Sequence, residues 1–230
     1  MRSLLKRWEQ LPQELQNDSV RPYYEALSRK RGQLLLKRVF DILLSLVLLV
    51  LLSPVMLILA LAIRLDSPGE VLFRQVRVTQ YGQEFRIFKF RTMVANAQQL
   101  GTQVTVQGDM RITRVGKLLR KCRLDELPQL LNILIGQMSF VGTRPEVPRY
   151  VRQYTPQMLA TLLLPAGVPS QASIRYKDED RLLDSSADPD RTYVEQVLPG
   201  KMEYNLNSLL DFSLWQDLKT MVQTVGAVLH

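Results

Sequence analysis

One long apolar run stands out in the hydrophobic pattern of this chain. From Ile42 to Ile63 the sequence continues for 22 residues without a charged side chain. A helix of that length reaches about 33 Å at about 1.5 Å per residue, and the apolar core of a bilayer is about 30 Å thick. The run is also longer than the apolar region of a signal peptide, and 41 residues precede it. It therefore predicts a membrane helix.

Basic residues flank this run on both sides. Because Lys and Arg are enriched on the cytoplasmic side of membrane helices, both ends have the pattern of cytoplasmic flanks. The basic residues before the run are Arg29, Lys30, Arg31, Lys37 and Arg38, and those after it are Arg64, Arg74 and Arg77.

The residues alone leave two arrangements of the run open. In the first, the helix enters the bilayer, bends at Ser53-Pro54 and returns to the same leaflet. Proline removes a backbone N–H, and a neighbouring serine hydroxyl can help satisfy the freed backbone groups. In the second, the run is a kinked single-pass anchor with a basic extracytoplasmic start, since lipid-facing re-entry is uncommon.

Alternating apolar and polar residues predict a β-hairpin after the membrane helix. Its strands cover residues 71–78 and 84–91, with turn residues between them. Lys89 and Arg91 lie two residues apart and therefore point to the same side. The alternation slips within the second strand, which indicates either a bulge or a strand covered on both faces by Phe85, Ile87, Phe88 and Phe90.

Helical spacing appears at both ends of the chain. Near the N-terminus it predicts an apolar stripe on an interfacial helix, made by Tyr23, Leu27, Leu34 and Leu35. Near the C-terminus it predicts helices over 193–199 and 202–210. A further helix over 212–229, with Trp215, Leu218, Met221, Val222 and Val225 at helical spacing, has the pattern of a core or membrane-surface helix.

The supply of residues narrows the chemistry. In its 230 residues the chain has one cysteine, Cys122, and one histidine, His230. This excludes a disulfide framework, a zinc site of cysteine and histidine, and a nucleophile activated by histidine within the chain. The share of hydrophobic residues, 46%, is that of an ordinary folded domain. Carboxylates, lysine, arginine or a metal held by oxygen ligands must therefore carry any chemistry.

Much of the net charge of +8 comes from one stretch. Between Arg111 and Arg123 there are six basic residues and no acid. Apolar residues at helical spacing predict an amphipathic helix there, or two short helices broken at Gly116. A solvated face is the usual role of such a stretch, but beside a membrane anchor it would lie near lipid phosphates. We do not expect nucleic acid as a partner, because aromatic residues are not interleaved with the basic ones.

Two adjacent acids, Asp125 and Glu126, follow the basic stretch directly. One interpretation is structural: Asp125 caps a helix, Glu126 lies in its first turn, and Pro128 is tolerated there. The other is chemical, because carboxylates beside a cationic face can stay ionised, hold Mg²⁺ and meet a phosphorylated substrate. Phosphoryl transfer uses this combination, and a carboxylate can act in it as a nucleophile that forms an acyl phosphate.

Five sequence blocks lie in order along the chain: Lys37–Asp41, Ser53-Pro54, Lys89–Met93, Leu124–Gln129 and Met138–Pro145. Together they resemble the bacterial sugar transferases, the monotopic polyprenyl-phosphate phosphoglycosyl transferases, in their small catalytic-domain form. The match continues to Asp217–Lys219, so that it covers most of the chain.

The resemblance implies an α-rich α+β membrane protein with a re-entrant helix, interfacial helices and a small β-hairpin. It selects re-entry, with the kink at Ser53 and Pro54, over the single-pass anchor. We expect an N-terminal interfacial extension over residues 1–36, the re-entrant helix over 37–64, and a catalytic domain over 65–230. That domain is expected to pack on the cytoplasmic face of the bacterial inner membrane.

The activity that the resemblance implies is transfer of a sugar 1-phosphate from a UDP-sugar to undecaprenyl phosphate, a polyprenyl phosphate, with release of UMP. This would be the first membrane step in the assembly of a surface glycan, by a ping-pong mechanism. Asp125 matches the nucleophile and is expected to hold Mg²⁺, and Glu126 matches the second acid, expected to assist proton transfer or metal placement. The matching phosphate-binding residues are Lys89, Arg91 and Arg120, and those near the nucleotide are Gly142, Arg144 and Pro145.

The chain departs from the pattern of the family in two places. Gly142-Thr143-Arg144-Pro145 replaces Gly-Pro-Arg-Pro, which keeps the arginine. The stretch 164–171 lacks the arginine and tryptophan of the usual Arg-Pro-Gly-Ile-Thr-Gly-Trp, and Arg175 or Lys177 could supply the missing charge. We expect the acids at 178–180 to form a solvated turn rather than a metal site.

Two other hypotheses compete with the transferase. The altered stretch 164–171 supports a catalytically silent membrane module that recruits other envelope glycan enzymes through its basic face. A single-pass protein with an extracytoplasmic domain would place a UDP-sugar site where no UDP-sugar is available. The sequence leaves open which UDP-sugar is used and whether the chain forms a homo-oligomer.

Overall fold

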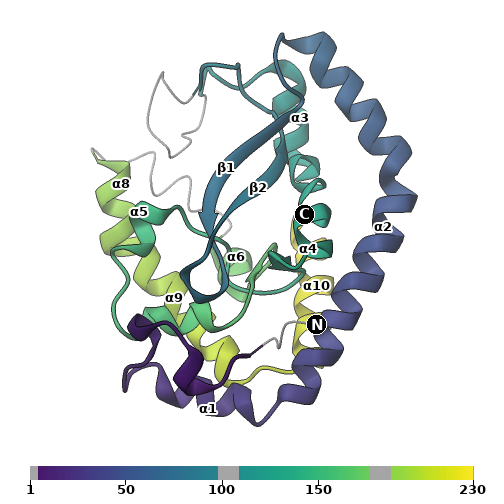
Figure 1. The fold of residues 1–230 in the computed structure, drawn as a ribbon. Helices are drawn as coiled ribbons and strands as arrows, with labels where there is room; N and C mark the ends of the chain where they lie inside the picture. The colour runs from purple at the N-terminus through teal and green to yellow at the C-terminus, as the bar shows by residue number, and fades with distance from the viewer. Residues whose placement is uncertain (1–4, 98–108, 177–187, 230) are drawn as a thin grey trace.

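The computed structural model describes residues 5–97, 109–176 and 188–229. A β-hairpin lies at the centre, with the long helix α2 bowed along one side of it and the later helices on the other (Figure 1). This confirms the predicted α-rich α+β class with a small hairpin. The elements are α1 (Arg21–Ser28), α2 (Arg31–Asp66), β1 (Leu72–Val78), β2 (Glu84–Phe90), α3 (Arg114–Lys121), α4 (Gln129–Leu134), β3 (Met138–Ser139), α5 (Pro148–Val151), β4 (Ala166–Gly167), α6 (Gln171–Arg175), α8 (Pro189–Thr192), α9 (Leu198–Leu210) and α10 (Leu214–Leu229).

Helix α2 is continuous through Pro54. Proline has no N–H to offer the carbonyl of Val50 four residues earlier, and the hydroxyl of Ser53 donates to that carbonyl instead, at 2.8 Å. Among the described residues, α2 is the one helix long and apolar enough to cross a membrane, and 6% of its most apolar 18-residue window is buried. Such low burial is consistent with membrane association and differs from that of a core helix in a soluble protein.

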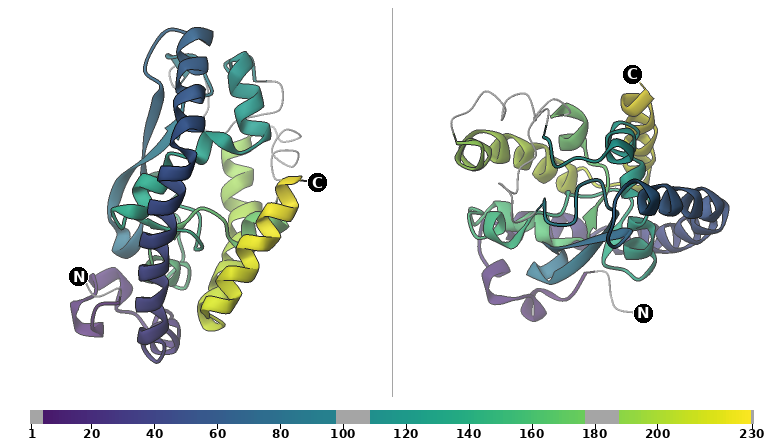
Figure 2. Two further views of the ribbon diagram at one scale, coloured as in Figure 1. Left: turned by 90° about the vertical axis from the view of Figure 1, so that its right-hand side faces the viewer. Right: turned by 90° about the horizontal axis from the view of Figure 1, so that it is seen from above.

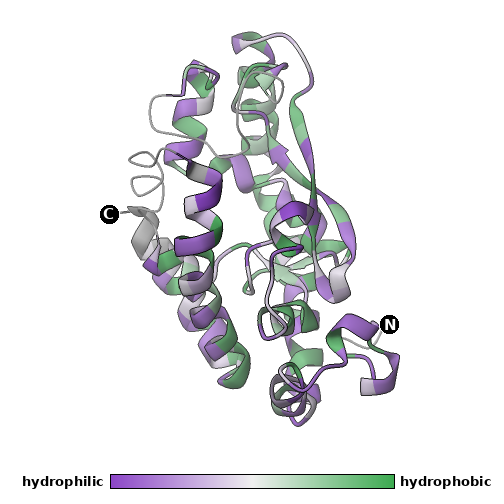
Figure 3. Ribbon diagram, turned by 90° about the vertical axis from the view of Figure 1, so that its left-hand side faces the viewer, coloured by the Kyte–Doolittle hydropathy of each residue, from purple (hydrophilic) through white to green (hydrophobic). Residues whose placement is uncertain are grey.

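The remainder of the protein packs against α2 along the whole length of the helix (Figure 2). Near its start, Lys37 donates to the carbonyl of Val141 at 2.9 Å, and Asp41 accepts from the N–H of Phe140 at 3.1 Å. Near its end, Ile63 is buried in a cluster with β2 and α3. The opposite face of α2 is an uninterrupted exposed apolar stripe that includes Leu43, Leu46, Val47, Val50, Leu51, Leu57, Ile58, Leu61 and Leu65. On the side of the molecule away from α2, hydrophilic and hydrophobic residues are mixed along the helices (Figure 3).

The hairpin has an unbroken antiparallel register, from Leu72 opposite Phe90 to Val78 opposite Glu84. The bulge alternative is therefore wrong, and β2 is instead covered on both faces, since Ile87 and Phe90 are both buried. Asn132 of α4 forms hydrogen bonds with the backbone of β2 along the edge that does not pair with β1. Its side chain accepts from the N–H of Phe88 at 2.9 Å and donates to the carbonyl of Arg86 at 3.0 Å.

The N-terminal stretch forms part of the protein core. Of the predicted stripe, Tyr23, Leu27 and Leu34 are buried against residues of α9 and of the stretch 160–164, and Leu35 is exposed. The first three thus face protein and not a membrane surface, because they pack among apolar side chains of the later part of the chain.

Two predicted helix breaks are absent from the structure. Helix α3 runs through Gly116, whose lack of a side chain serves packing instead, since a Cβ there would lie 2.1 Å from the carbonyl oxygen of Thr92. The predicted helices over 193–199 and 202–210 are continuous through a π turn at Tyr193–Val197. Helix α10 confirms the last predicted helix, with Trp215, Leu218 and Val222 exposed.

We predict that Asn132→Ala destabilises the protein by about 2–4 kcal/mol, because it removes a fully buried side chain and the partners of the N–H of Phe88 and the carbonyl of Arg86. Thermal unfolding of the detergent-solubilised chain measures the effect. Asn207→Ala, at an exposed position of α9, is the matched control and should change stability by no more than about 0.5 kcal/mol. Equal melting temperatures for the two variants would contradict this role of Asn132.

Candidate functional site

The acid pair lies on a short 3₁₀ turn, Leu124–Glu126, between α3 and α4. Arg123, just before it, has a φ of +56°, in the left-handed region that non-glycine residues seldom adopt. This residue reverses the chain after α3. The residue that precedes α4 as its N-cap is Pro128, so the interpretation of Asp125 as a helix cap is wrong.

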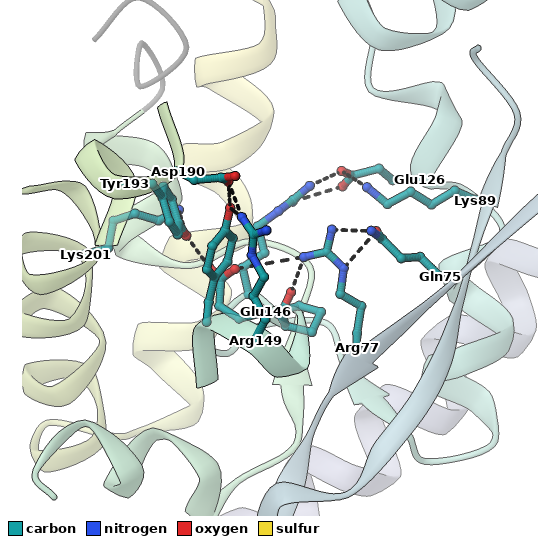
Figure 4. A network of polar contacts seen from close by, with 12 residues as sticks. Gln75, Arg77, Lys89, Glu126, Glu146, Arg149, Asp190, Tyr193 and Lys201 are labelled. Carbon is teal, nitrogen blue, oxygen red and sulfur yellow. Dashed lines mark hydrogen bonds and ion pairs between the residues drawn. The ribbon is translucent and has the colours of Figure 1, made fainter. Parts of the chain in front are cut away.

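Glu126 is buried among three cations that come from three segments. Figure 4 shows one of them, Lys89, beside Glu126. Arg144 donates to both carboxylate oxygens, from Nη2 to Oε1 at 2.5 Å and from Nη1 to Oε2 at 3.4 Å. Lys89 of β2 donates to Oε1 at 3.4 Å, and Nη1 of Arg123 lies 4.0 Å from the same oxygen. Glu126 thereby holds these three side chains around one point.

The pKa values of the two neighbouring acids are shifted in opposite directions. Burial alone would raise the pKa of Glu126, but the charges of Arg144, Lys89 and Arg123 outweigh it and hold that pKa far below its ordinary value. The pKa of Asp125 is raised, chiefly by burial and next by the negative charge of Glu126, against the opposing charges of Lys89, Arg120 and Arg144. Glu126 is therefore a fixed anion, and Asp125 is the more basic carboxylate.

Asp125 also has an oxygen that is available for chemistry. Its Oδ1 atom is buried and has no hydrogen-bond partner among the described residues. A buried acceptor without a partner costs about 1–3 kcal/mol, which a bound ligand or ion can recover. Adjacent acids of such unlike environment are typical of a divided catalytic role.

The donor set at Asp125 fits Mg²⁺ and does not fit a metal that needs many protein ligands. Among the described residues there is no cluster of three or more acidic, histidine or cysteine side chains that could hold a metal ion. Mg²⁺ is commonly held by one or two carboxylates, with substrate phosphates and water completing its shell. The carboxylate of Asp125, whose Oδ1 is buried with no hydrogen-bond partner among the described residues, can supply the protein ligand of such a site.

The structure brings most of the predicted phosphate-binding residues together, with one exception. Lys89 and Arg144 contact Glu126, and Arg120, half-buried on α3, is close enough to influence the charge of Asp125. Arg91 lies elsewhere. Its guanidinium donates to the carbonyls of Ser67 at 2.6 Å and Pro68 at 2.9 Å, in the turn that follows α2. Arg91 thereby ties this turn to the end of β2.

The segment 142–145 is held by its backbone. The N–H of Gly142 donates to Pro169 at 3.1 Å, and the carbonyl of Thr143 accepts from Gly167 at 2.9 Å. Gly142 and Gly167 pack so closely that a Cβ on Gly167 would lie 2.0 Å from the nitrogen of Gly142. The altered stretch 164–171 thus supports the segment from which Arg144 extends.

Arg175 and Lys177 are the two residues that could supply positive charge to the altered stretch, and the structure describes the first of them. Arg175 lies exposed at the end of α6. Lys177 and the acids at 178–180 lie outside the described residues. A cavity of about 50 Å³ adjoins the stretch and is lined by polar groups that include Lys37, Ser170 and Asp217, but neither acid of the pair lines it.

Sequence reasoning missed two residues of this site. Arg123 belongs to the basic stretch, but its contact with Glu126 depends on a backbone turn that no sequence pattern shows. Arg77 was noted only as a membrane flank, and in the structure it donates to the carbonyl of Pro145 at 3.0 Å. The alternation of side chains along the two strands could have identified Arg77, because it places this residue on the same face of the hairpin as Lys89.

Comparison with known proteins gives a consistent result. Residues 32–230 match the family described as "Bacterial sugar transferase". The chain is 39% identical over 197 residues to the UDP-N-acetylgalactosamine-undecaprenyl-phosphate N-acetylgalactosaminephosphotransferase of Aeromonas hydrophila, which covers 84% of this chain and 44% of that protein. It is 35% identical over 198 residues to the UDP-glucose:undecaprenyl-phosphate glucose-1-phosphate transferase of Caulobacter vibrioides, covering 85% and 70%.

A shorter match is closer in sequence. The chain is 50% identical over 112 residues to the exopolysaccharide production protein PSS of Rhizobium leguminosarum, covering 48% of this chain and 56% of that protein. The chain thus spans less than two thirds of the length of the Aeromonas and Rhizobium relatives. It spans 70% of the length of the Caulobacter relative.

We predict that the affinity of this site for an anion such as sulfate begins to fall as the pH rises through about 8. Burial is the main cause that lowers the pKa of Lys89 to about 8. The charge of Glu126 opposes this shift, and the charges of Arg144 and Arg77 add to it. The ammonium of Lys89 is therefore lost above that pH. Calorimetric titration at pH 7 and 9 measures the change. Lys89→Arg stays charged over this range and should bind the anion equally at both pH values. An equal fall in that variant would show that Lys89 is not the titrating group.

Proposed function

We propose, because the chain belongs to the bacterial sugar transferase family, that it transfers a sugar 1-phosphate from a UDP-sugar to undecaprenyl phosphate and releases UMP. The names of the Aeromonas and Caulobacter relatives support this substrate class, and the two names specify different sugars. The name of the Rhizobium relative supports a place in exopolysaccharide assembly, as the membrane step that loads the first sugar onto the lipid.

The observation that carries the proposal is the buried, unpartnered Oδ1 of Asp125 beside a cluster of cations. We assign this oxygen as the nucleophile. It attacks the phosphorus that bears the sugar, the bond from that phosphorus to the bridging oxygen breaks, and UMP leaves with the bonding electrons. The sugar phosphate is then an acyl phosphate on Asp125.

The second half of the reaction returns Asp125 to its starting state. A phosphate oxygen of undecaprenyl phosphate attacks the same phosphorus, the bond to Asp125 breaks, and the lipid diphosphate sugar is formed. The carboxylate is regenerated. The two acceptors, Asp125 and the lipid, thus use one site in turn, which is a ping-pong mechanism.

The cations around Glu126 supply the electrostatic stabilisation. Arg144 and Lys89 retain partly exposed side chains, so a phosphoryl group can approach their positive charges. Glu126 holds them in place, and its low pKa gives it no proton to donate. Mg²⁺ held by Asp125 and substrate oxygens would further neutralise the diphosphate.

We also propose that α2 is re-entrant and that the site faces the cytoplasm at the inner membrane. The protein packs along the whole of α2, so a crossing perpendicular to the bilayer would carry the charged hairpin and α3 into the hydrocarbon region. An α2 that enters from one side can bury its exposed apolar stripe in lipid and keep the catalytic domain, residues 65–230, in water. UDP-sugars are available on that side.

Asp125→Asn should abolish turnover, because the amide cannot form the acyl phosphate. Wild-type protein incubated with UDP-sugar and Mg²⁺ without lipid should gain the mass of one sugar phosphate, and undecaprenyl phosphate should remove it. Intact-protein mass spectrometry measures both steps. Asp125→Asn should gain no mass, and Glu126→Gln, which leaves Asp125 intact, is the comparison. UMP release by Asp125→Asn at the wild-type rate would exclude Asp125 as the nucleophile.

Re-entry predicts that both ends of α2 lie on the cytoplasmic side. In a Cys122→Ser background, Glu25→Cys and Glu70→Cys place single thiols at exposed positions before and after α2. A maleimide that cannot cross the membrane should label neither thiol in intact cells whose outer membrane is permeabilised, and both after lysis. Labelling of one thiol from outside would establish a single-pass anchor.

A further inference from the structure

We propose that Arg77 binds the diphosphate of the UDP-sugar. This rests on the proposed function and adds a substrate-binding residue that lies outside the acid pair and its three cations. Arg77 lies on β1, below the pair formed by Glu126 and Lys89 in the network of Figure 4.

The register of the hairpin places Arg77 on the face that carries Lys89. Arg77 lies opposite Phe85, Gln75 opposite Ile87, and these positions share a face with Lys89 because side chains alternate along each strand. The guanidinium of Arg77 contacts Gln75, two residues earlier on β1. This is the direction of Lys89, which lies opposite Phe73. In agreement with this, the charge of Arg77 contributes to the lowered pKa of Lys89.

The guanidinium is held in one orientation. Its Nε and Nη2 atoms donate to Oε1 of Gln75 at 3.1 and 2.7 Å, and Nη1 donates to the carbonyl of Pro145 at 3.0 Å. A guanidinium has five N–H groups. Two of those of Arg77 therefore have no hydrogen-bond acceptor among the described residues, and they are fixed in direction before any ligand arrives.

The carboxylate nearest to Arg77 is already engaged. Oε2 of Glu146 lies 4.0 Å from Nη1 of Arg77, beyond hydrogen-bond distance. Its other oxygen, Oε1, accepts from the hydroxyl of Tyr193, which Lys201 also contacts at 3.3 Å. Glu146 therefore offsets part of the charge of Arg77 and leaves the remaining donors directed elsewhere.

The charges of this region are unbalanced in a way that fits a diphosphate. The cations repel one another: Arg144 acts against the charge of Arg77, and both act against that of Lys89. The side chain of Arg77 is 23% exposed, comparable with 19% for Lys89 and 31% for Arg144, so a ligand can reach all three. The cations Arg77, Lys89, Arg120, Arg123 and Arg144 face the anions Asp125, Glu126 and Glu146.

The cations of this region outnumber its anions, and the diphosphate of a UDP-sugar is an anion. A ligand of that charge relieves the repulsion among Arg77, Lys89 and Arg144, and the repulsion is present before binding. Bidentate contact with phosphate oxygens is the interaction for which a fixed guanidinium is best suited.

The test is the affinity of Arg77→Gln for UDP, measured by equilibrium dialysis with labelled UDP on the detergent-solubilised full chain. Arg74→Gln is the matched control. It removes the same charge from the same strand, but Arg74 lies on the opposite face, with its guanidinium 5.2 Å from the ring of Phe88. We expect Arg77→Gln to bind UDP about 10- to 100-fold more weakly, the effect of one charge-assisted hydrogen bond, and Arg74→Gln to stay within about twofold of wild type.

UMP release under the same conditions separates this proposal from the transferase. A KM for UDP-sugar raised as much as the UDP affinity falls, with kcat changed far less, supports a substrate-binding role. Wild-type UDP affinity in Arg77→Gln overturns it, whether or not UMP is released. Loss of UDP binding in Arg77→Gln, with no UMP release by wild type for any donor, supports the diphosphate site and overturns the transferase.

Two milder variants keep the proposal testable if Arg77→Gln does not fold. Arg77→Lys keeps the positive charge but loses the planar set of N–H donors. Gln75→Leu keeps the guanidinium but removes the acceptor that orients it. Both should bind UDP more weakly than wild type, at an unchanged melting temperature. Wild-type affinity in both variants would overturn the role of Arg77.

Discussion

The site depends on one interaction, the burial of an ionised Glu126 among Arg144, Lys89 and Arg123. A carboxylate removed from water must be compensated by charges and hydrogen bonds, or it takes up a proton. Each of the three cations comes from a different segment: the loop after β3, strand β2, and the turn before α4. The position of those segments relative to one another is thus a condition for a stable Glu126, and the hydrogen bonds of Asn132 between α4 and β2 help to meet it.

That same compensation explains why two adjacent carboxylates have unlike properties. The cations engage Glu126 directly, whereas they act on Asp125 only through space, and burial raises its pKa. One acid is consequently an anchor for positive charge, and the other has an oxygen that accepts no hydrogen bond from the described part of the chain. In a phosphoryl transfer both are needed, because the nucleophile must approach a diphosphate that other groups have already neutralised.

Helix α2 adds a second constraint, that of the membrane. Its exposed apolar stripe is stable only in a nonpolar environment, and its other face is bound to the protein from Lys37 to Ile63. Arg91 belongs to this constraint and not to the phosphate site. It follows the end of β2, and its guanidinium donates to the carbonyls of the turn after α2. Lys89 and Arg91 thus serve the chemistry and the membrane anchor separately.

Local patterns in the sequence were enough to predict the apolar helix, the hairpin, the basic helix before the acid pair and the helix at the C-terminus, because hydrophobic periodicity and turn residues act over a few neighbouring positions. The single cysteine and the terminal histidine already restricted the chemistry to carboxylates and basic residues. Only the tertiary structure decided that Arg91 lies away from the acid pair, that Tyr23 and Leu27 face the core, and that Arg123 and Arg77 join the site. Those outcomes depend on a left-handed backbone turn and on contacts between residues far apart in the chain, where burial and charge are decided by the neighbours that folding brings together.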